Sequence, residues 1–213
     1  MVIVGLTGGV ASGKSIVSQV LKEEGAYLID ADQIARELVQ PRASAWKELI
    51  KIFGKEILLE DGSVDRKKLA KKVFSDPEQR DLLNRILHPL IKKEMGRRLE
   101  AIFRKDPEAI VVFDAPLLIE TGNHREMDKI VVVTSTEEQQ IERLKEREGM
   151  NQEGARKIIA SQIASEEKLK VADFVIRNEG TLAETRKRTK EVFQELKRIA
   201  LQKKEESPTR QQN

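Results

Sequence analysis

The stretch Gly8-Gly9-Val10-Ala11-Ser12-Gly13-Lys14-Ser15 decides the fold, because its spacing is G-x-x-x-x-G-K-S. The apolar run 2–6 that precedes it has the length of a strand. Apolar residues at helical spacing follow it, and Gly25 ends that helix. A strand, a glycine loop and a helix in this order predict a phosphate-binding P-loop, and the alternative is a glycine-rich turn that matches by accident.

A P-loop binds anions mainly through its main chain. Successive backbone N–H groups point inward, and the positive end of the following helix dipole faces the same spot. Lys14 is expected to reach the β- and γ-phosphates, and the Ser15 hydroxyl is expected to bind Mg²⁺. The residues that we expect to contact a nucleoside triphosphate are Gly8, Gly9, Val10, Ala11, Ser12, Gly13, Lys14, Ser15 and Ile16.

The composition limits the other classes of function. The chain has 213 residues, which suits one domain with an inserted subdomain. Its net charge is only +3, and basic and acidic residues are interspersed along the chain. A surface of mixed charge therefore explains the small excess of basic residues better than a nucleic-acid interface does. No cysteine is present, which excludes disulfides and thiolate metal sites. No apolar run approaches the ~18 residues of a membrane span and no signal-peptide pattern is visible, so we expect a cytoplasmic protein that binds no membrane.

The rest of the chain alternates between strands and helices except in one long segment. Strands are expected at 26–30, 109–114, 129–134 and 173–176, and the run 109–114 is apolar enough to be buried on both faces. Between 41 and 105 only helices are expected, and His88-Pro89 should separate the last two of them. This segment is longer than a crossover needs and indicates a subdomain for a second substrate. From Gln202 the polar sequence predicts a frayed tail.

Three acids lie at or just beyond the ends of predicted strands. Asp30 and Asp32 lie two apart on an expected extended segment, so both carboxylates should share one face at the edge of the sheet where the P-loop lies. The alternative is that one of them only caps the helix 33–39. Asp114, at the end of the buried strand, can either bind Mg²⁺ through its water shell or cap a loop.

A pair of helices after the fourth strand has the features of a lid. Thr136 and Gln139 form a capping-box pattern, and Arg143 and Arg147 lie one turn apart on one face of the helix that follows. A second helix should extend from Asn151 to about residue 164. A lid arginine would stabilise charge on a transferring phosphoryl group, and the alternative is a solvated charged face.

Several motifs together resemble the dephospho-CoA kinase family, and they occur in that family's order from residue 2 to about 200. They are Thr7-Gly8-Gly9, Asp30-Ala31-Asp32 with Ile34-Ala35-Arg36, His88-Pro89, Asp114-Ala115-Pro116-Leu117-Leu118-Ile119-Glu120, and Asn178-Glu179-Gly180. The chain departs from the family's usual loop at two positions, with Ala11 in place of glycine and Ile16 in place of a frequent threonine. Neither change should prevent ATP binding.

The resemblance implies an α/β three-layer P-loop kinase fold, similar to nucleoside monophosphate kinases, with a five-stranded parallel sheet. Its expected parts are a core of 1–33, 106–138 and 168–200, a helical CoA-binding insertion of 34–105, a helical lid of 139–167, and a flexible tail of 201–213.

The resemblance also implies transfer of the ATP γ-phosphoryl group to the ribose 3′-hydroxyl of dephospho-CoA, with ATP and Mg²⁺ required. Asp32 would be the base toward that hydroxyl, with Lys14 and Arg143 as the other catalytic residues. Asn178 and Gly180 would lie by the adenine of ATP. The expected metal ligand is Ser15, and the expected acceptor-binding residues are Asp32, Arg36, His88, Asp114 and Leu117.

Some alternatives stay open. His88 either contacts substrate or fixes the helix junction with Pro89. Another small-molecule kinase of the nucleoside monophosphate kinase type is the nearest rival function, whereas a regulatory GTPase should carry an N-K-x-D motif that this sequence lacks. We expect small-molecule substrates, no nucleic acid partner, and a monomer or small homo-oligomer.

Overall fold

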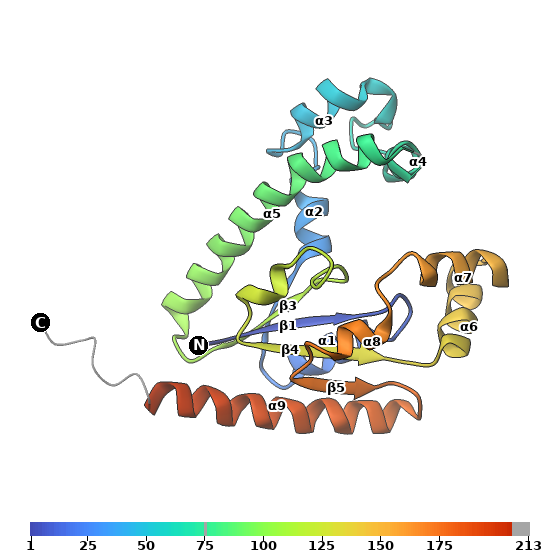
Figure 1. Ribbon diagram of the computed structural model, residues 1–213. Coiled ribbons are helices and arrows are strands. Elements are labelled where there is room, and N and C mark those ends of the chain that lie inside the picture. The colour runs from blue at the N-terminus through green and yellow to red at the C-terminus, as the bar shows by residue number, and fades with distance from the viewer. Residues whose placement is uncertain (75, 206–213) are drawn as a thin grey trace, which may run out of the picture. The chain divides into compact units, whose positions relative to one another are not determined.

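The computed structural model describes residues 1–74 and 76–205 and contains a parallel sheet (Figure 1). Its five strands within these residues are β1 (Val2–Gly8), β2 (Tyr27–Asp30), β3 (Ile110–Asp114), β4 (Lys129–Thr134) and β5 (Phe174–Arg177), in the order β2-β3-β1-β4-β5. The central strand β1 pairs in parallel with β3 and β4. The predicted strands are therefore confirmed, and the P-loop leaves the middle of the sheet.

Helices cover both faces of this sheet. Alternate residues along β4 point to opposite faces, so Val131 and Val133 pack with α1 (Lys14–Glu23) and α9 (Leu182–Glu205). On the other face, Val132 packs with the loop that follows β3 and with α8 (Ser165–Leu169). A short 3₁₀ helix, η2 (Asn123–Glu126), leads into β4. The three-layer fold is as predicted.

The chain divides into two compact units, and each has its own core. One unit contains Met1–Ile29 and the described residues from Ile102 onward, and the other is Asp30–Ala101. The second unit is helical, as predicted for this segment. It contains α2 (Ala31–Leu38), α3 (Trp46–Phe53), the 3₁₀ helix η1 (Lys55–Ile57), α4 (Arg66–Phe74) and most of α5 (Pro77–Lys105).

The predicted helix break at His88-Pro89 is wrong, because α5 is continuous from Pro77 to Lys105. Proline inside a helix removes one hydrogen bond and costs about 3 kcal/mol. Here Leu87 and Leu90, on either side of Pro89, pack against the same core of the second unit. Burial on both sides of the proline offsets the local cost, so the helix continues through it.

The predicted extended segment at Asp30-Ala31-Asp32 is also wrong. Asp30 is the N-cap of α2 and accepts a 2.9 Å hydrogen bond from the Gln33 N–H group. Asp32 therefore lies in the first helical turn, and the argument that both carboxylates share one face of a strand does not hold. The capping alternative is correct for Asp30 and does not apply to Asp32.

Helix ends differ from prediction at two further places. The second lid helix, α7 (Gln152–Ala160), ends earlier than residue 164, and the separate α8 was not predicted. Helix α9 continues to Glu205, so the first residues of the expected tail, 201–205, are helical. Lys203 and Lys204 there form ion pairs of 2.6 and 2.5 Å with Asp128 and Glu108. The remainder of the predicted tail, 206–213, lies outside the described residues.

The two helices of the predicted lid begin where the sequence indicates. Helix α6 (Glu137–Glu148) opens with the Thr136–Gln139 capping box, and Gly149 ends it in a left-handed conformation. Asn151 caps α7 by accepting from the Gly154 N–H group at 2.8 Å. The two helices pack together through the small apolar cluster Ile141, Leu144 and Ala155.

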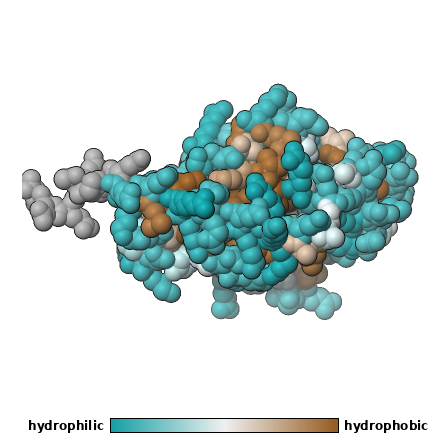
Figure 2. Space-filling model, turned by 90° about the horizontal axis from the view of Figure 1, so that it is seen from below, coloured by the Kyte–Doolittle hydropathy of each residue, from teal (hydrophilic) through white to brown (hydrophobic). Residues whose placement is uncertain are grey.

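Hydrophilic residues cover most of the face seen in Figure 2, with hydrophobic residues in limited patches. This agrees with a chain in which 35% of residues are charged. In the described part of the chain, every helix is too short or too polar to cross a membrane.

Candidate active site

The P-loop connects β1 to α1 through backbone conformations that favour glycine. Gly13 has φ +92° and is the N-cap of α1, and a side chain there would overlap the side-chain amide of Asn178. Ala11 also has a positive φ, +55°. A non-glycine residue in this left-handed region costs roughly 1–2 kcal/mol, and glycine would not carry that cost.

Two of the loop's N–H groups are already hydrogen-bonded. Val10 donates to Oε1 of Gln162 at 2.8 Å, and Ser12 donates to the Gly9 carbonyl at 3.1 Å. Within residues 1–74 and 76–205, no acceptor is found for the N–H groups of Ala11, Gly13, Lys14 and Ser15. These donors lie at the N-terminus of α1, where the helix dipole adds positive potential. The loop therefore has the chemistry to bind an anion.

Lys14 binds the acid at the end of β3. Its ammonium group donates to Oδ1 of Asp114, which is buried. The pairing of β1 with β3 brings these residues together, since Leu6 and Asp114 are register partners. Sequence reasoning named both residues as candidates but did not predict that they form an ion pair.

Three lid side chains hydrogen-bond the main chain of the P-loop. Gln140 donates from Nε2 to the Val10 carbonyl at 2.9 Å, while Gln162 accepts from the N–H group of the same residue. Arg143 donates to the Ala11 carbonyl at 3.0 Å and to the Asn178 carbonyl at 3.0 Å. The segment predicted to be a lid thus hydrogen-bonds two consecutive loop residues, Val10 and Ala11. Guanidinium has five N–H donors, so Arg143 keeps further donors for a ligand.

Gln140 and Gln162 were missed by sequence reasoning. Gln140 is 5% exposed beside the buried Ile141 and Leu144, and a polar residue on an apolar helix face is the signal that could have identified it. Its position also explains Gly9, where a Cβ atom would lie 2.6 Å from the Gln140 Nε2 atom. Gln162 lies just beyond α7, and we find no sequence signal for it.

Asn178 connects the end of β5 to the loop. Its buried side chain donates to the Ser12 carbonyl at 2.9 Å and accepts from the Thr185 hydroxyl at 2.9 Å. Gly180 is exposed, and a Cβ atom there would overlap the Glu184 carboxylate. That carboxylate forms a capping box with Thr181 at the start of α9.

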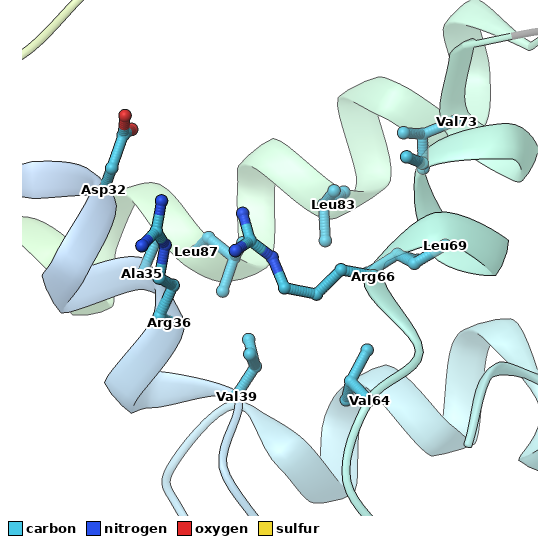
Figure 3. Close-up of a pocket in the computed structure, with 11 residues that line it drawn as sticks. Asp32, Ala35, Arg36, Val39, Val64, Arg66, Leu69, Val73, Leu83 and Leu87 are labelled. Carbon is cyan, nitrogen blue, oxygen red and sulfur yellow. The ribbon is translucent and has the colours of Figure 1, made fainter. Parts of the chain in front are cut away.

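The predicted acceptor-binding residues fall into separate groups. Asp32 and Arg36 are exposed and line one cavity of the second unit (Figure 3). His88 is exposed and lines a different hollow of that unit, with Asp81 and Arg85. Leu117, in the first unit, is 51% exposed in the loop that follows Asp114.

The order of the parallel strands and the P-loop that follows β1 define a fold of the P-loop kinase class. The shikimate kinase of Acinetobacter baumannii has the same fold, with a TM-score of 0.52 at 17% identity over 92% of this chain and 93% of that one. The sequence pattern of the dephospho-CoA kinase family matches residues 2–184. This chain belongs to the dephospho-CoA kinase family.

Individual relatives agree with this family membership. A dephospho-CoA kinase of Corynebacterium glutamicum is 44% identical over 196 residues, which are 92% of this chain and 100% of the relative. One of Listeria monocytogenes is 46% identical, covering 86% of this chain and 92% of the relative. Among solved structures, TT1252 from Thermus thermophilus has a TM-score of 0.79 at 31% identity, covering 92% of this chain and 97% of that one. The dephospho-CoA kinase of Campylobacter jejuni has a TM-score of 0.64 at 28% identity, covering 91% and 96%.

Proposed function

We propose that this chain phosphorylates the ribose 3′-hydroxyl of dephospho-CoA with ATP, which gives coenzyme A. The single observation that carries the proposal is membership of the dephospho-CoA kinase family over residues 2–184. The reaction is a phosphoryl transfer to an alcohol. We further propose that the substrates are small molecules in the cytoplasm.

ATP is proposed to bind along residues 8–16. The unpartnered N–H groups of Ala11, Gly13, Lys14 and Ser15 support this, because main-chain donors at a helix N-terminus suit phosphate oxygens. Lys14 would supply positive charge to the phosphates. We expect the remaining donors of Arg143 to do the same from the lid, with Asn178 and Gly180 beside the adenine.

Magnesium is proposed to bind with the phosphates. Mg²⁺ usually takes only one or two protein ligands beside waters and substrate phosphates. Ser15 is exposed in the first turn of α1, next to the unpartnered loop donors, and its hydroxyl fits that requirement. Bound there, the ion would neutralise charge on the phosphates.

Asp32 is proposed to orient the 3′-hydroxyl and accept its proton. A carboxylate is too weak a base to ionise a sugar hydroxyl beforehand, but a loose transition state does not require it. The bond from the γ-phosphorus to the 3′-oxygen forms as the bond to ADP breaks, and the hydroxyl proton passes late to Asp32. Because Asp30 serves as the helix cap, Asp32 is available for this role. Arg36, His88, Asp114 and Leu117 remain proposed acceptor contacts.

The direct test is incubation of the purified protein with ATP, MgCl₂ and dephospho-CoA, followed by chromatographic detection of coenzyme A. AMP offered as acceptor tests the rival reading as a nucleoside monophosphate kinase. Faster turnover of AMP than of dephospho-CoA would refute the proposal.

Asp32→Asn tests the assignment of the base. It should lower kcat by about 10²–10⁴-fold, the usual contribution of general acid–base catalysis, and leave ATP affinity unchanged. Asp76→Asn is the matched control, because Asp76 caps the start of α5 and asparagine caps equally well. A near-normal kcat for Asp32→Asn would show that another group takes the proton.

A further inference from the structure

Val10 of the P-loop is hydrogen-bonded on both sides by the predicted lid (139–167). Its N–H group donates to Oε1 of Gln162 at 2.8 Å, and its carbonyl accepts from Nε2 of Gln140 at 2.9 Å. Gln140 lies on α6 and Gln162 lies just beyond α7, so each half of the predicted lid supplies one of the two side chains. Because the two contacts fix two successive peptide units of the loop, neither unit can rotate freely.

A bound carbonyl also fixes the N–H group of its own peptide unit. The unit is planar and trans, so its N–H group points opposite to its carbonyl. The carbonyl of Val10 and the N–H group of Ala11 belong to one unit. By binding that carbonyl, Gln140 therefore directs the Ala11 N–H group away from the predicted lid.

The peptide unit between Ser12 and Gly13 has the same arrangement with a different partner. Asn178 binds the Ser12 carbonyl at 2.9 Å and so directs the Gly13 N–H group to the opposite side. In the part of the chain that the structure describes, the N–H groups of both Ala11 and Gly13 lack an acceptor. Successive main-chain donors of this kind are suited to phosphate oxygens.

Apolar packing holds the two helices of the predicted lid against the loop. The side chains of Val10 and Ala11 pack on the cluster Ile141, Leu144 and Ala155, which joins α6 to α7. This packing keeps the glutamine amides within reach of the loop main chain. Gln140 is 5% exposed, so water competes little for its hydrogen bond.

We infer that Gln140 and Gln162 are positioning residues for the phosphates of ATP. They hold the peptide units on either side of Val10, so that the N–H group of Ala11 points at a phosphate oxygen. The predicted lid is then part of the phosphate site through its two glutamines, in addition to the proposed contact of Arg143. This inference rests on the proposed binding of ATP along residues 8–16.

Proton–nitrogen NMR of the labelled protein tests the direction of the loop's N–H groups. A hydrogen bond to an anion moves an amide proton signal downfield, so sodium tripolyphosphate should shift the signals of Ala11 and Gly13. Gln140→Met keeps the length of the side chain but removes its amide. It should largely abolish the shift of Ala11 and leave that of Gly13, which Asn178 directs. Gln152→Met, on the exposed surface of α7, is the matched control and should change neither.

Binding and steady-state kinetics test the contribution to affinity. Gln140→Met and Gln162→Met should each raise the Kd for tripolyphosphate and the KM for ATP by about 2–10-fold, the net contribution of one hydrogen bond. The KM for dephospho-CoA should stay constant, which a general loosening of the fold would not allow. Gln152→Met again serves as the control.

Hydrogen exchange tests the same coupling in the reverse direction. If the predicted lid strengthens phosphate binding, then bound phosphate must stabilise the lid by a similar factor. Saturating tripolyphosphate should therefore slow the exchange of the α6 and α7 amides in the unaltered protein. The double variant Gln140→Met/Gln162→Met should lose most of this protection.

The outcomes separate this inference from the proposed function. An Ala11 signal that does not move in the unaltered protein, or an equal loss of the Ala11 and Gly13 shifts in Gln140→Met, would overturn the inference. So would KM values for ATP and dephospho-CoA that rise equally, or a KM for ATP that does not rise. Failure to convert dephospho-CoA would refute the proposed function instead. The experiments with tripolyphosphate need no turnover and still test the two glutamines in that case.

Discussion

The side-chain amide of Asn178 donates a 2.9 Å hydrogen bond to the carbonyl oxygen of Ser12. Through this bond the end of β5 holds the P-loop, and the Thr185 hydroxyl holds the amide in turn. Gly13 must be glycine partly for this reason, because a side chain there would overlap the same amide. A residue expected beside the adenine therefore also determines the shape of the phosphate loop.

Asn178→Asp should destabilise the protein and weaken ATP binding together. The variant places a carboxylate oxygen against the Ser12 carbonyl, so a buried donor is replaced by a charge without that partner. A loss of about 2–3 kcal/mol in the free energy of unfolding is expected, measured by urea denaturation, with a raised KM for ATP. Thr185→Val is the control, since it leaves the bond from Asn178 to the Ser12 carbonyl in place and should leave the KM for ATP unchanged. Normal ATP affinity in Asn178→Asp would contradict the bracing role.

Gly9→Ala should disturb the hydrogen bond from the Gln140 side chain to the Val10 carbonyl. The new methyl group would lie 2.6 Å from the Gln140 amide, which must then move off the Val10 carbonyl. We expect each of Gly9→Ala and Gln140→Ala to cost about 1–2 kcal/mol of stability. The double variant should cost less than the sum by at least ~0.5 kcal/mol, because Gln140→Ala opens the space that the new methyl group needs. Strict additivity in urea unfolding would show that the two positions are independent.

Lys168→Met should strongly destabilise the fold. Lys168 is 1% exposed, and its ammonium group lies 2.7 Å from the Glu120 carboxylate, close enough for an ion pair although not aligned as a hydrogen bond. Removing one partner of a buried pair leaves an uncompensated charge and costs about 3–5 kcal/mol. The double variant Lys168→Met/Glu120→Leu should recover most of that loss. Lys170→Met, in the exposed pair with Glu167, should stay within ~0.5 kcal/mol in the same thermal unfolding assay.

Stability should fall in acid partly through Glu94. Hydrogen bonds from Arg97 and then Arg98 lower the pKa of this carboxyl from 4.5 to about 2. A pKa lowered by folding stabilises the protein above pH 4.5, and the contribution is lost as the pH falls toward 2. Because Glu94 and the two arginines are partly exposed to solvent, we expect them to contribute about 1 kcal/mol to the free energy of unfolding. Glu94→Gln should flatten this part of the curve of unfolding free energy against pH, and an unchanged slope between pH 4.5 and 2 would count against it.

Local patterns predicted most of the secondary structure. The five strands, the P-loop and the Thr136–Gln139 capping box were predictable because each depends on neighbours within a few residues. The break at Pro89 was predicted from an equally local rule and was wrong, since packing of Leu87 and Leu90 outweighs it. The shared face of Asp30 and Asp32 failed for a related reason, because the N-cap at Asp30 starts the helix two residues early.

The lid contacts of the loop could not be predicted in this way. Gln140 and Gln162 bind a residue that lies 130 and 152 positions away in the chain. No local spacing encodes such a pairing, because it depends on where the sheet order places the lid.

The sequence by itself determined that an anion-binding loop lies between a strand and a helix, that the fold is α/β, and which family the chain resembles. Those properties depend on backbone torsions, helix caps and apolar periodicity, which act over a few residues. Only the tertiary structure decided that Lys14 binds Asp114, that Asn178, Gln140 and Gln162 hold the loop, and that Arg66 joins Arg36 at one cavity. These contacts join distant segments, and burial of the whole core, rather than any local preference, brings those segments together.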